Sequence, residues 1–286
     1  MKGVAMVDVH KLIAQANEMA ALPASTVRLA ELINDPDCNL DEVVESVAFD
    51  QALTLKLLRA ANSVASAPAE PVRNVQEAVI RMGTAQVMAL AVAAGARTIL
   101  QPSVPAYGLA EGELWRHSVA AAAAAEAMQD SGEFERLPEF FTAALLHDVG
   151  KLVMARYLTP EILGFIRRAQ EEDHLDRLEA ESLLLEVNHA ELGGLIAQHW
   201  KLPARVAQGI IYHHNPGQGF DTICDLTYLA NQIAKHIEAG LDGRKFDLVI
   251  ALDVGERLAL TPKRIEELCP LAVSRYEQVR RRYDAV

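Results

Sequence analysis

Apolar residues recur along this chain at the three- and four-residue spacing of helices, and alternating runs typical of strands are scarce. In the first hundred residues the periodic segments are short and are separated by turn residues such as Asn34-Asp35-Pro36-Asp37. Ser25, Asn39 and Asp50 each stand where a helix N-cap is expected. We therefore expect a compact lobe of short helices over about 7–21, 25–33, 39–47, 50–61, 75–82 and 87–100.

The segment Gln101-Pro102-Ser103-Val104-Pro105 carries two prolines, which cannot continue a helix, and longer periodic segments follow it. We expect an N-terminal helical lobe over 1–104 and a helical bundle with a C-terminal extension over 105–286. Thr261-Pro262 is a favourable helix start for the last helical region. The other expected helices are 113–128, 138–152, 160–169, 178–186, 189–199, 202–213 and 223–239.

Composition agrees with an all-α fold, because apolar residues make up 51% of the chain and aromatic residues only 5%, with alanine and leucine dominant. The net charge of −12 opposes nucleic-acid binding, and the basic run Arg280-Arg281-Arg282 is typical of an ordinary helix C-terminus. No apolar run reaches the roughly 18 residues of a membrane span, and no signal-peptide pattern is present. The three cysteines are widely spaced, which fits a reducing compartment. We expect a cytoplasmic protein that binds neither nucleic acid nor a membrane.

Candidate chemistry centres on the run Ala143-Ala144-Leu145-Leu146-His147-Asp148-Val149-Gly150-Lys151, which places a histidine beside an aspartate at the polar end of an apolar helix. Adjacent helical residues point about 100° apart, so both can reach one ion only where the helix bends or ends, as Gly150 allows. His117, His189 and the doublet His213-His214 are expected partners. Imidazole and carboxylate ligands gathered in this way suit a divalent Fe, Mn, Zn or Ni ion.

Each histidine also has a purely structural interpretation. His117 could be a core or helix-capping residue, His189 could start a helix, and one member of the doublet could simply end one. Lys151 could be a favourable charge at a helix end. The remaining histidines have no such context and are interpreted as surface or core residues: His10, His174, His199 and His236.

The ordered series His, His-Asp, His, His-His resembles the HD superfamily of metal-dependent phosphohydrolases, in particular its regulatory HDOD branch and the related HD-GYP phosphodiesterases. The N-terminal half resembles the HDOD signature in Leu22-Pro23, in Asn34-Asp35-Pro36, in the stretch from Asp50 to Ser63 and in the stretch from Ala78 to Gly83. The resemblance covers roughly residues 20–215, and Gln51 departs from the proline that is usual there. It implies an N-terminal lobe packed on an HD-type bundle, and a role in bacterial signal transduction, often beside response-regulator receiver domains.

The resemblance also bears on activity. It implies that Lys151 contacts a substrate phosphate, and that the site is completed by an aspartate where this chain has Asn231. Asp225 precedes Asn231 by six residues, which turns it about 120° away on a helix, so it is a poor substitute. The HD-GYP continuation ending in Gly-Tyr-Pro is absent after His214. A neutral amide in place of a bridging carboxylate weakens a two-metal centre.

The sequence and its family resemblance leave two alternative functions. The first is a signalling module that binds a partner protein or a small ligand and retains part of an HD metal site, with weak or no hydrolase activity. The second is an active metal-dependent phosphohydrolase of a cyclic dinucleotide or another phosphodiester, with Asp148 and Lys151 as catalytic residues. The retained ligands favour the hydrolase, whereas Asn231 and the missing Gly-Tyr-Pro segment favour the module.

Overall fold

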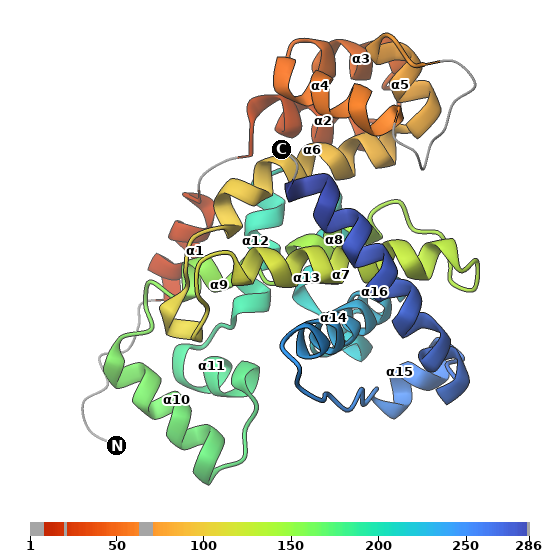
Figure 1. The fold of residues 1–286 in the computed structure, drawn as a ribbon. Coiled ribbons are helices and arrows are strands. Elements are labelled where there is room, and N and C mark those ends of the chain that lie inside the picture. Colours follow the sequence, from red (N-terminus) through yellow and green to blue (C-terminus); the bar gives the residue numbers. More distant parts are fainter. Residues whose placement is uncertain (1–8, 20–21, 63–70, 285–286) are drawn as a thin grey trace.

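The computed structural model describes residues 9–19, 22–62 and 71–284, and within these ranges it contains helices and no strand (Figure 1). Val104 and Leu109 form an isolated antiparallel bridge in the segment between the two groups of helices. The predicted all-α class is confirmed. The expected loop at 66–74 lies partly outside the described residues, as do the ends of the expected helix at 7–21.

The N-terminal lobe consists of four short helices and one longer helix: α2 (Ala24–Asn34), α3 (Leu40–Ala48), α4 (Gln51–Ala61), α5 (Val75–Met82) and the longer α6 (Thr84–Leu100). Asn39 and Asp50 cap α3 and α4 as predicted, and Asn39 forms a capping box with Glu42. The predicted cap at Ser25 is wrong, because α2 begins after Pro23 and Ser25 lies inside it. The Ser25 hydroxyl instead donates to Asp50 Oδ2 at 2.6 Å, which ties α2 to the start of α4.

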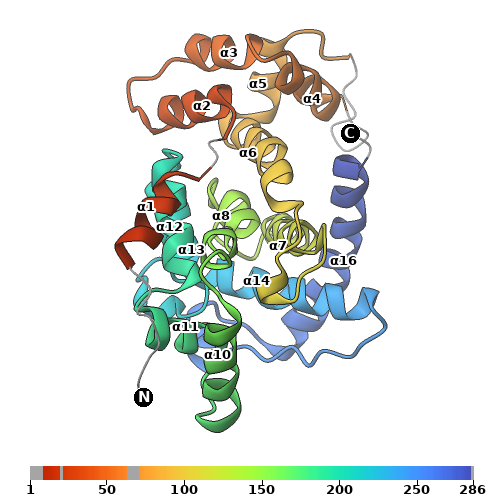
Figure 2. The same ribbon diagram turned by 90° about the vertical axis from the view of Figure 1, so that its left-hand side faces the viewer.

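The second part of the chain is a helical bundle around a buried alanine-rich helix, α7, as Figure 2 shows. Residues 120–125 of α7 are alanines that are at most 1% exposed, so neighbouring backbones can approach closely. Helices α8, α14 and α16 pack around it, and α1 (Val9–Asn17) packs on α12 and α9. The bundle helices are α7 (Glu113–Asp130), α8 (Phe140–Leu146), α9 (Lys151–Met154), α10 (Pro160–Glu172), α11 (Arg177–Leu185), α12 (His189–His199), α13 (Ala204–Ile211), α14 (Thr222–Leu241), α15 (Leu252–Arg257) and α16 (Pro262–Asp284).

The segment expected to be one helix over 138–152 is instead two short helices, α8 and α9, separated by a turn. The turn begins at His147, so the chain changes direction where the His-Asp pair stands. Gly150 makes this possible, since a Cβ atom there would lie 1.9 Å from the carbonyl oxygen of His189 and 2.5 Å from the amide nitrogen of Gly193. Only glycine lets the turn approach α12 this closely.

The last helix, α16, packs along α7 and α14. Arg275 on α16 forms ion pairs with Glu126 and Asp130 on α7. The short helix α15, which precedes it, was not predicted. Among the described helices none is by itself long and apolar enough to span a membrane, and α5 with α6 meets that criterion of length and composition only as a pair bent by 108°.

Candidate metal centre

Five histidines, Asp148 and Asn231 meet inside the bundle, although they come from widely separated parts of the chain. His117 lies on α7, His189 begins α12, and Asn231 lies on α14. His147 and Asp148 lie in the turn after α8, and His213 and His214 follow α13. Asp148 belongs to both candidate metal-binding groups found among the described residues. The cluster therefore has two halves that share one carboxylate.

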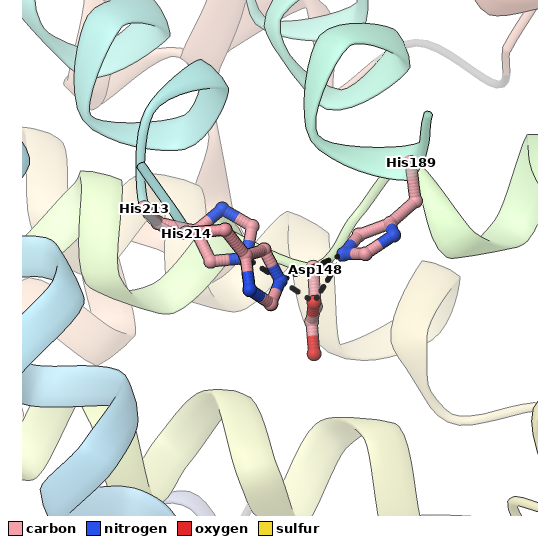
Figure 3. Close-up of side chains that lie close together, drawn as sticks. All are labelled: Asp148, His189, His213 and His214. Carbon is pink, nitrogen blue, oxygen red and sulfur yellow. Dashed lines mark hydrogen bonds and ion pairs between the residues drawn. The ribbon is translucent and has the colours of Figure 1, made fainter. Parts of the chain in front are cut away.

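The first half, here called the three-histidine half, consists of His189, His213 and His214 around Asp148. Figure 3 shows their three rings turned toward the carboxylate. Asp148 Oδ1 lies 3.5 Å from His189 Nε2 and 3.8 Å from His213 Nε2. His214 Nε2 lies 3.2 Å from His189 Nε2. Ligand atoms of these four residues all lie within 4.8 Å of one another.

The second half, here called the two-histidine half, consists of His117, His147 and Asn231 on the other carboxylate oxygen. Asp148 Oδ2 lies 3.6 Å from His117 Nε2 and 3.4 Å from His147 Nε2. The two Nε2 atoms are 3.1 Å apart, and His117 Nε2 is 3.2 Å from Asn231 Oδ1. Asn231, which stands where the resemblance implies an aspartate, thus lies beside His117.

Four rings are oriented by a hydrogen bond from Nδ1 to an acceptor outside the cluster. For His147 and His213 the acceptors are backbone carbonyl oxygens of the preceding helices, those of Ala144 at 2.8 Å and Ile210 at 2.7 Å. For His117 and His189 they are carboxylates, those of Glu238 at 2.9 Å and Glu181 at 2.7 Å. With the proton on Nδ1, each Nε2 presents a lone pair to the centre, which is the arrangement found in metal-ligating histidines.

With the protons on Nδ1, hydrogen-bond acceptor nitrogens of neighbouring rings face one another. In that tautomer His117 Nε2 and His147 Nε2 are both lone-pair donors, so they cannot hydrogen-bond to each other. His213 Nε2 is buried and has no hydrogen-bond partner among the described residues. Two ligands of one ion with bonds of about 2.0–2.2 Å stand roughly 3–3.5 Å apart. The separations in the cluster are close to that range, so the residues present fit a divalent cation.

The electrostatics of the cluster also favour a cation. Burial lowers the pKa of His147 and of His213, and burial with the neighbouring His189 lowers that of His214 to about 2. These rings are therefore neutral and free to ligate at neutral pH. Burial opposes ionisation of Asp148, but Lys151 and the histidines hold its pKa well below the ordinary value, so it is a carboxylate. No cysteine belongs to either group, which leaves nitrogen and oxygen ligands suited to Fe, Mn, Zn or Ni.

Two lysines flank the carboxylate. Lys151 Nζ donates to Asp148 Oδ2 at 2.6 Å, on the side of the two-histidine half. Lys235, one turn after Asn231 on α14, is half-buried, and burial lowers its pKa. Among the described residues no hydrogen bond or ion pair involves its ammonium group. Sequence reasoning proposed Lys151 as a phosphate contact, and it did not identify Lys235.

Sequence reasoning also missed the residues that orient the rings. Glu181 on α11 is fully buried and accepts hydrogen bonds from the Nδ1 and the backbone amide of His189, from the Tyr107 hydroxyl and from Arg177. His189 holds the pKa of Glu181 at about 2, against the effect of burial. A signal was present, because Glu181 interrupts the apolar stripe of Leu178 and Leu185 at helical spacing. Tyr107 comes from the segment after the predicted lobe boundary, in the short 3₁₀ helix Pro105–Tyr107.

Some of the histidines also had a purely structural interpretation, and the structure places these residues and Asp225 as follows. His189 is the first residue of α12, as its structural interpretation proposed, but the cap is Asn188, and the His189 ring lies in the cluster. Tyr212 is the C-cap of α13, and His213 follows it with Nδ1 on the carbonyl oxygen of Ile210 and Nε2 toward Asp148. Asp225 points elsewhere and forms a bidentate ion pair with Arg257, so it does not replace Asn231. His10, His174, His199 and His236 belong to neither candidate group. Metal ligation itself stays a prediction.

Two solved structures are similar to this chain in fold. A solved structure from Marinobacter aquaeolei VT8, named as a candidate signal transduction protein, aligns with a TM-score of 0.66 and 23% identity over 95% of this chain and 63% of its own. A candidate phosphohydrolase from Shewanella amazonensis SB2B aligns with a TM-score of 0.60 and 24% identity over 93% of this chain and 97% of its own. These likenesses show a shared fold.

An uncharacterized protein of Treponema pallidum is 27% identical over 199 residues, which are 70% of this chain and 38% of that protein. The chain thus spans well under half the length of this relative. The family model of the HDOD domain matches residues 19–216, which agrees with the stretch of about 20–215 that resembles the HDOD signature. Because the match takes in both the N-terminal lobe and the histidine cluster, the chain belongs to the HDOD domain family.

Proposed function

We propose that this protein is a regulatory signal-transduction module in which the three-histidine half holds a single divalent ion, with weak or no hydrolase activity. The observation that carries the proposal is the asymmetry around Asp148. One carboxylate oxygen faces His189 and His213, while the other accepts a hydrogen bond from the Lys151 ammonium at 2.6 Å. A cation of this chain therefore already neutralises the side of Asp148 on which a second ion would bind.

Charge balance supports one ion. Among the described residues, Asp148 is the only carboxylate directly within the cluster, since Glu181 and Glu238 contact the outer nitrogens of His189 and His117. Two neighbouring dications need several negative ligands, and at the position beside His117 this chain offers the neutral amide of Asn231. The two-histidine half is therefore the weaker site.

Burial supports a binding role over rapid turnover. The side chains of His147, Asp148, His189 and His213 are at most 3% exposed, and only His117 and His214 keep partial exposure. A phosphodiester would have to reach the ion past these side chains. We expect the output to be binding of a signalling partner protein or a small ligand, in the cytoplasm, with no role for nucleic acid or a membrane.

The second candidate is a phosphohydrolase, and the two lysines favour it. Lys151 and Lys235 place two ammonium groups near the same carboxylate, where they could neutralise a phosphoryl group. A bound divalent ion would supply a water of lowered pKa and polarise a phosphoryl oxygen. In that case Asp148 holds the ion and Lys151 contacts substrate, so Lys151 would have to leave Asp148.

Metal content and turnover, measured on one preparation, separate the two functions. The purified protein is loaded separately with Fe(II), Mn(II), Zn(II) or Ni(II), its bound metal is quantified, and hydrolysis of bis(p-nitrophenyl) phosphate and of cyclic di-GMP is followed. We expect about one ion per chain and no turnover above a His213→Ala control. Turnover of about 1 per second or more would instead establish the hydrolase, because such rates are ordinary for enzymes. A protein that binds none of the four ions would contradict both.

A further inference from the structure

A second candidate site lies where α6, α7 and α16 meet. These helices enclose a cavity of about 250 Å³. Helix α16 follows residue 216, so one wall of this cavity comes from outside the segment that matches the HDOD family model. The lining combines guanidinium groups with aromatic rings; its main residues are Arg97, Trp115, Arg116, Tyr276 and Arg280.

The arginines are the first indication of the ligand. Three of them, from three different helices, line one small cavity in a chain whose net charge is −12. Such a concentration of positive charge on one cavity favours an anion. Arginine also presents five N–H donors in a planar fork that matches a phosphate or carboxylate group.

The carboxylates that contact Arg116 and Arg280 do not use all of their N–H donors. Arg116 Nη2 donates to Glu113 at 3.4 Å, and its Nε lies 3.7 Å from Glu238, beyond hydrogen-bond distance. That buried Nε has no hydrogen-bond partner in the described part of the chain. Arg280 Nη2 donates to Glu277 at 3.1 Å. A buried donor without an acceptor is costly, so an anion that supplied one would be stabilised here.

The remaining wall is apolar. Trp115 is 6% exposed and Tyr276 is 2% exposed, and Val119 lies beside them on the lining. Burial raises the pKa of the Tyr276 hydroxyl, and the nearby guanidinium groups of Arg280 and Arg116 oppose that rise. The lining of the cavity thus combines positively charged groups with apolar surface.

We propose that this cavity binds a small phosphorylated molecule, with its phosphoryl group on Arg116, Arg97 and Arg280 and an apolar portion against Trp115 and Tyr276. The volume of about 250 Å³ is at the lower edge of small-molecule sites, which are typically about 300–1,000 Å³. A phosphomonoester therefore fits better than a cyclic dinucleotide. The site does not depend on the proposed metal, because none of its lining residues belongs to the histidine cluster.

Binding can be tested with probes that separate charge from apolar contact. Phenylphosphonate carries both features, methylphosphonate only the charge, and benzyl alcohol only the ring. Calorimetry on the unmodified protein, with and without EDTA, reports affinity whether or not metal is present. The chain has two tryptophans, so a Trp200→Phe variant also leaves Trp115 as the single tryptophan, which can be excited selectively. We expect phenylphosphonate to bind, to change Trp115 fluorescence, and to bind at least tenfold more tightly than either other probe.

A matched pair of variants locates the binding. Arg280→Ala removes a guanidinium from the cavity, and we expect it to weaken phenylphosphonate binding by roughly tenfold or more, the loss typical of a hydrogen bond to a charged group. Arg244→Ala removes the same charge from an exposed position paired with Asp242, and it should leave binding unchanged. The proposal is wrong if phenylphosphonate does not bind at millimolar concentration, or if both variants weaken binding equally.

The cavity is also connected to the histidine cluster. Arg116 Nε lies 3.7 Å from Glu238 Oε1, and Glu238 Oε2 accepts the hydrogen bond of His117 Nδ1 at 2.9 Å. An anion that draws Arg116 away from Glu238 should strengthen the Glu238–His117 hydrogen bond. In ¹⁵N-histidine NMR, phenylphosphonate should shift the His117 signal and leave that of the exposed His174 in place. An unchanged His117 signal under saturating probe would overturn this connection, while the binding data would still decide the site.

Discussion

The two halves of the histidine cluster share Asp148 but differ in what surrounds them. The three-histidine half offers imidazole nitrogens, including the His213 Nε2 that has no hydrogen-bond partner among the described residues. The two-histidine half offers two imidazoles and a neutral amide, and its carboxylate oxygen is already bound to Lys151 at 2.6 Å. Similar ligand geometry therefore does not imply similar affinity for a cation.

The difference shows how two halves of one cluster can share a fold and still differ in charge. Beside His117 the chain offers the neutral amide of Asn231, and Lys151 places a positive charge on the same side of Asp148. Both features lie in the two-histidine half, whereas hydrogen bonds through Nδ1 orient rings in both halves. The geometry is kept by the surrounding helices, whereas the affinity depends on local charge.

The largest effect is expected from Asp148→Asn, which removes the carboxylate that both halves share. Bound metal should fall sharply, because the change removes the one negatively charged ligand that the two halves share. The change also leaves Lys151 without its buried counter-ion, so thermal stability should fall. Metal analysis and a melting curve on the same sample check both results. Retention of one ion per chain would show that the centre is organised around something other than Asp148.

A direct comparison of the halves comes from His213→Ala and His147→Ala, which remove equally buried rings. We expect His213→Ala to weaken metal binding by more than 100-fold, beyond the 10–100-fold typical of an outer contact. His147→Ala should weaken it less than tenfold. Competition with a fluorescent chelator measures both affinities. If the order is reversed, the ion sits in the two-histidine half and the charge argument is wrong.

A moderate effect is expected from Glu181→Gln, because Glu181 fixes His189 through Nδ1. Loss of such an outer partner typically costs about 10–100-fold in metal affinity, so we expect a loss in that range. Glu238→Gln is the matched change on the other half, where it contacts His117, and it should alter affinity for the single ion by less than tenfold. Equal losses would indicate that the ion draws on both halves.

Asn231→Asp tests the charge argument directly, because it adds a negative charge to the two-histidine half. We expect binding of a second ion, and with it the appearance or increase of phosphodiesterase turnover, because the added carboxylate supplies a missing negative ligand. His147→Ala in this background should remove both gains. Combining Asn231→Asp with Lys151→Met should further increase metal occupancy of the two-histidine half, because it removes the ammonium group from Asp148. Turnover would fall in this double variant if Lys151 contacts substrate. Equilibrium dialysis counts the ions, and unchanged stoichiometry would show that position 231 does not decide occupancy.

The smallest effect is expected on the free energy of unfolding, from a change at Ser25, which contacts Asp50 in the N-terminal lobe outside both halves. The Ser25 hydroxyl and the Leu53 amide lower the pKa of Asp50. A carboxyl group whose folded pKa is lowered stabilises the fold above its unfolded pKa of about 3.9, and this contribution is lost as pH falls through the folded pKa. Ser25→Ala should cost under about 1 kcal/mol at pH 7, and less at pH 3. Urea unfolding measures this, and metal content should stay unchanged; a larger cost at pH 3 would contradict the assignment.

The sequence by itself determined the helical class, most helix positions and the identity of the cluster residues. Helical spacing and local caps act over a few residues, so Asn39, Asp50 and the start of α12 could be identified from the chain alone. The ordered histidines and Asp148 were identifiable because residue type and order are one-dimensional properties. The prediction that Ser25 caps a helix was wrong, because α2 begins after Pro23. The Ser25 hydroxyl instead donates a hydrogen bond to Asp50 at the start of another helix.

Only the tertiary structure decided how those residues divide into two halves. Which oxygen of Asp148 faces which ring depends on the turn at Gly150, and that turn depends on the close approach of α12. Glu181 and Glu238 contact the outer nitrogens of His189 and His117, and Tyr107 contacts Glu181. The polar position of Glu181 in its apolar stripe is visible in the sequence, but the partners of these three residues are not. The cavity lined by Arg97, Arg116 and Arg280 likewise depends on tertiary packing, because α16 packs along α7 and there brings Arg280 to the same cavity as Arg97 of α6. Distances between charges decide cation affinity, and those distances arise only when distant segments pack together.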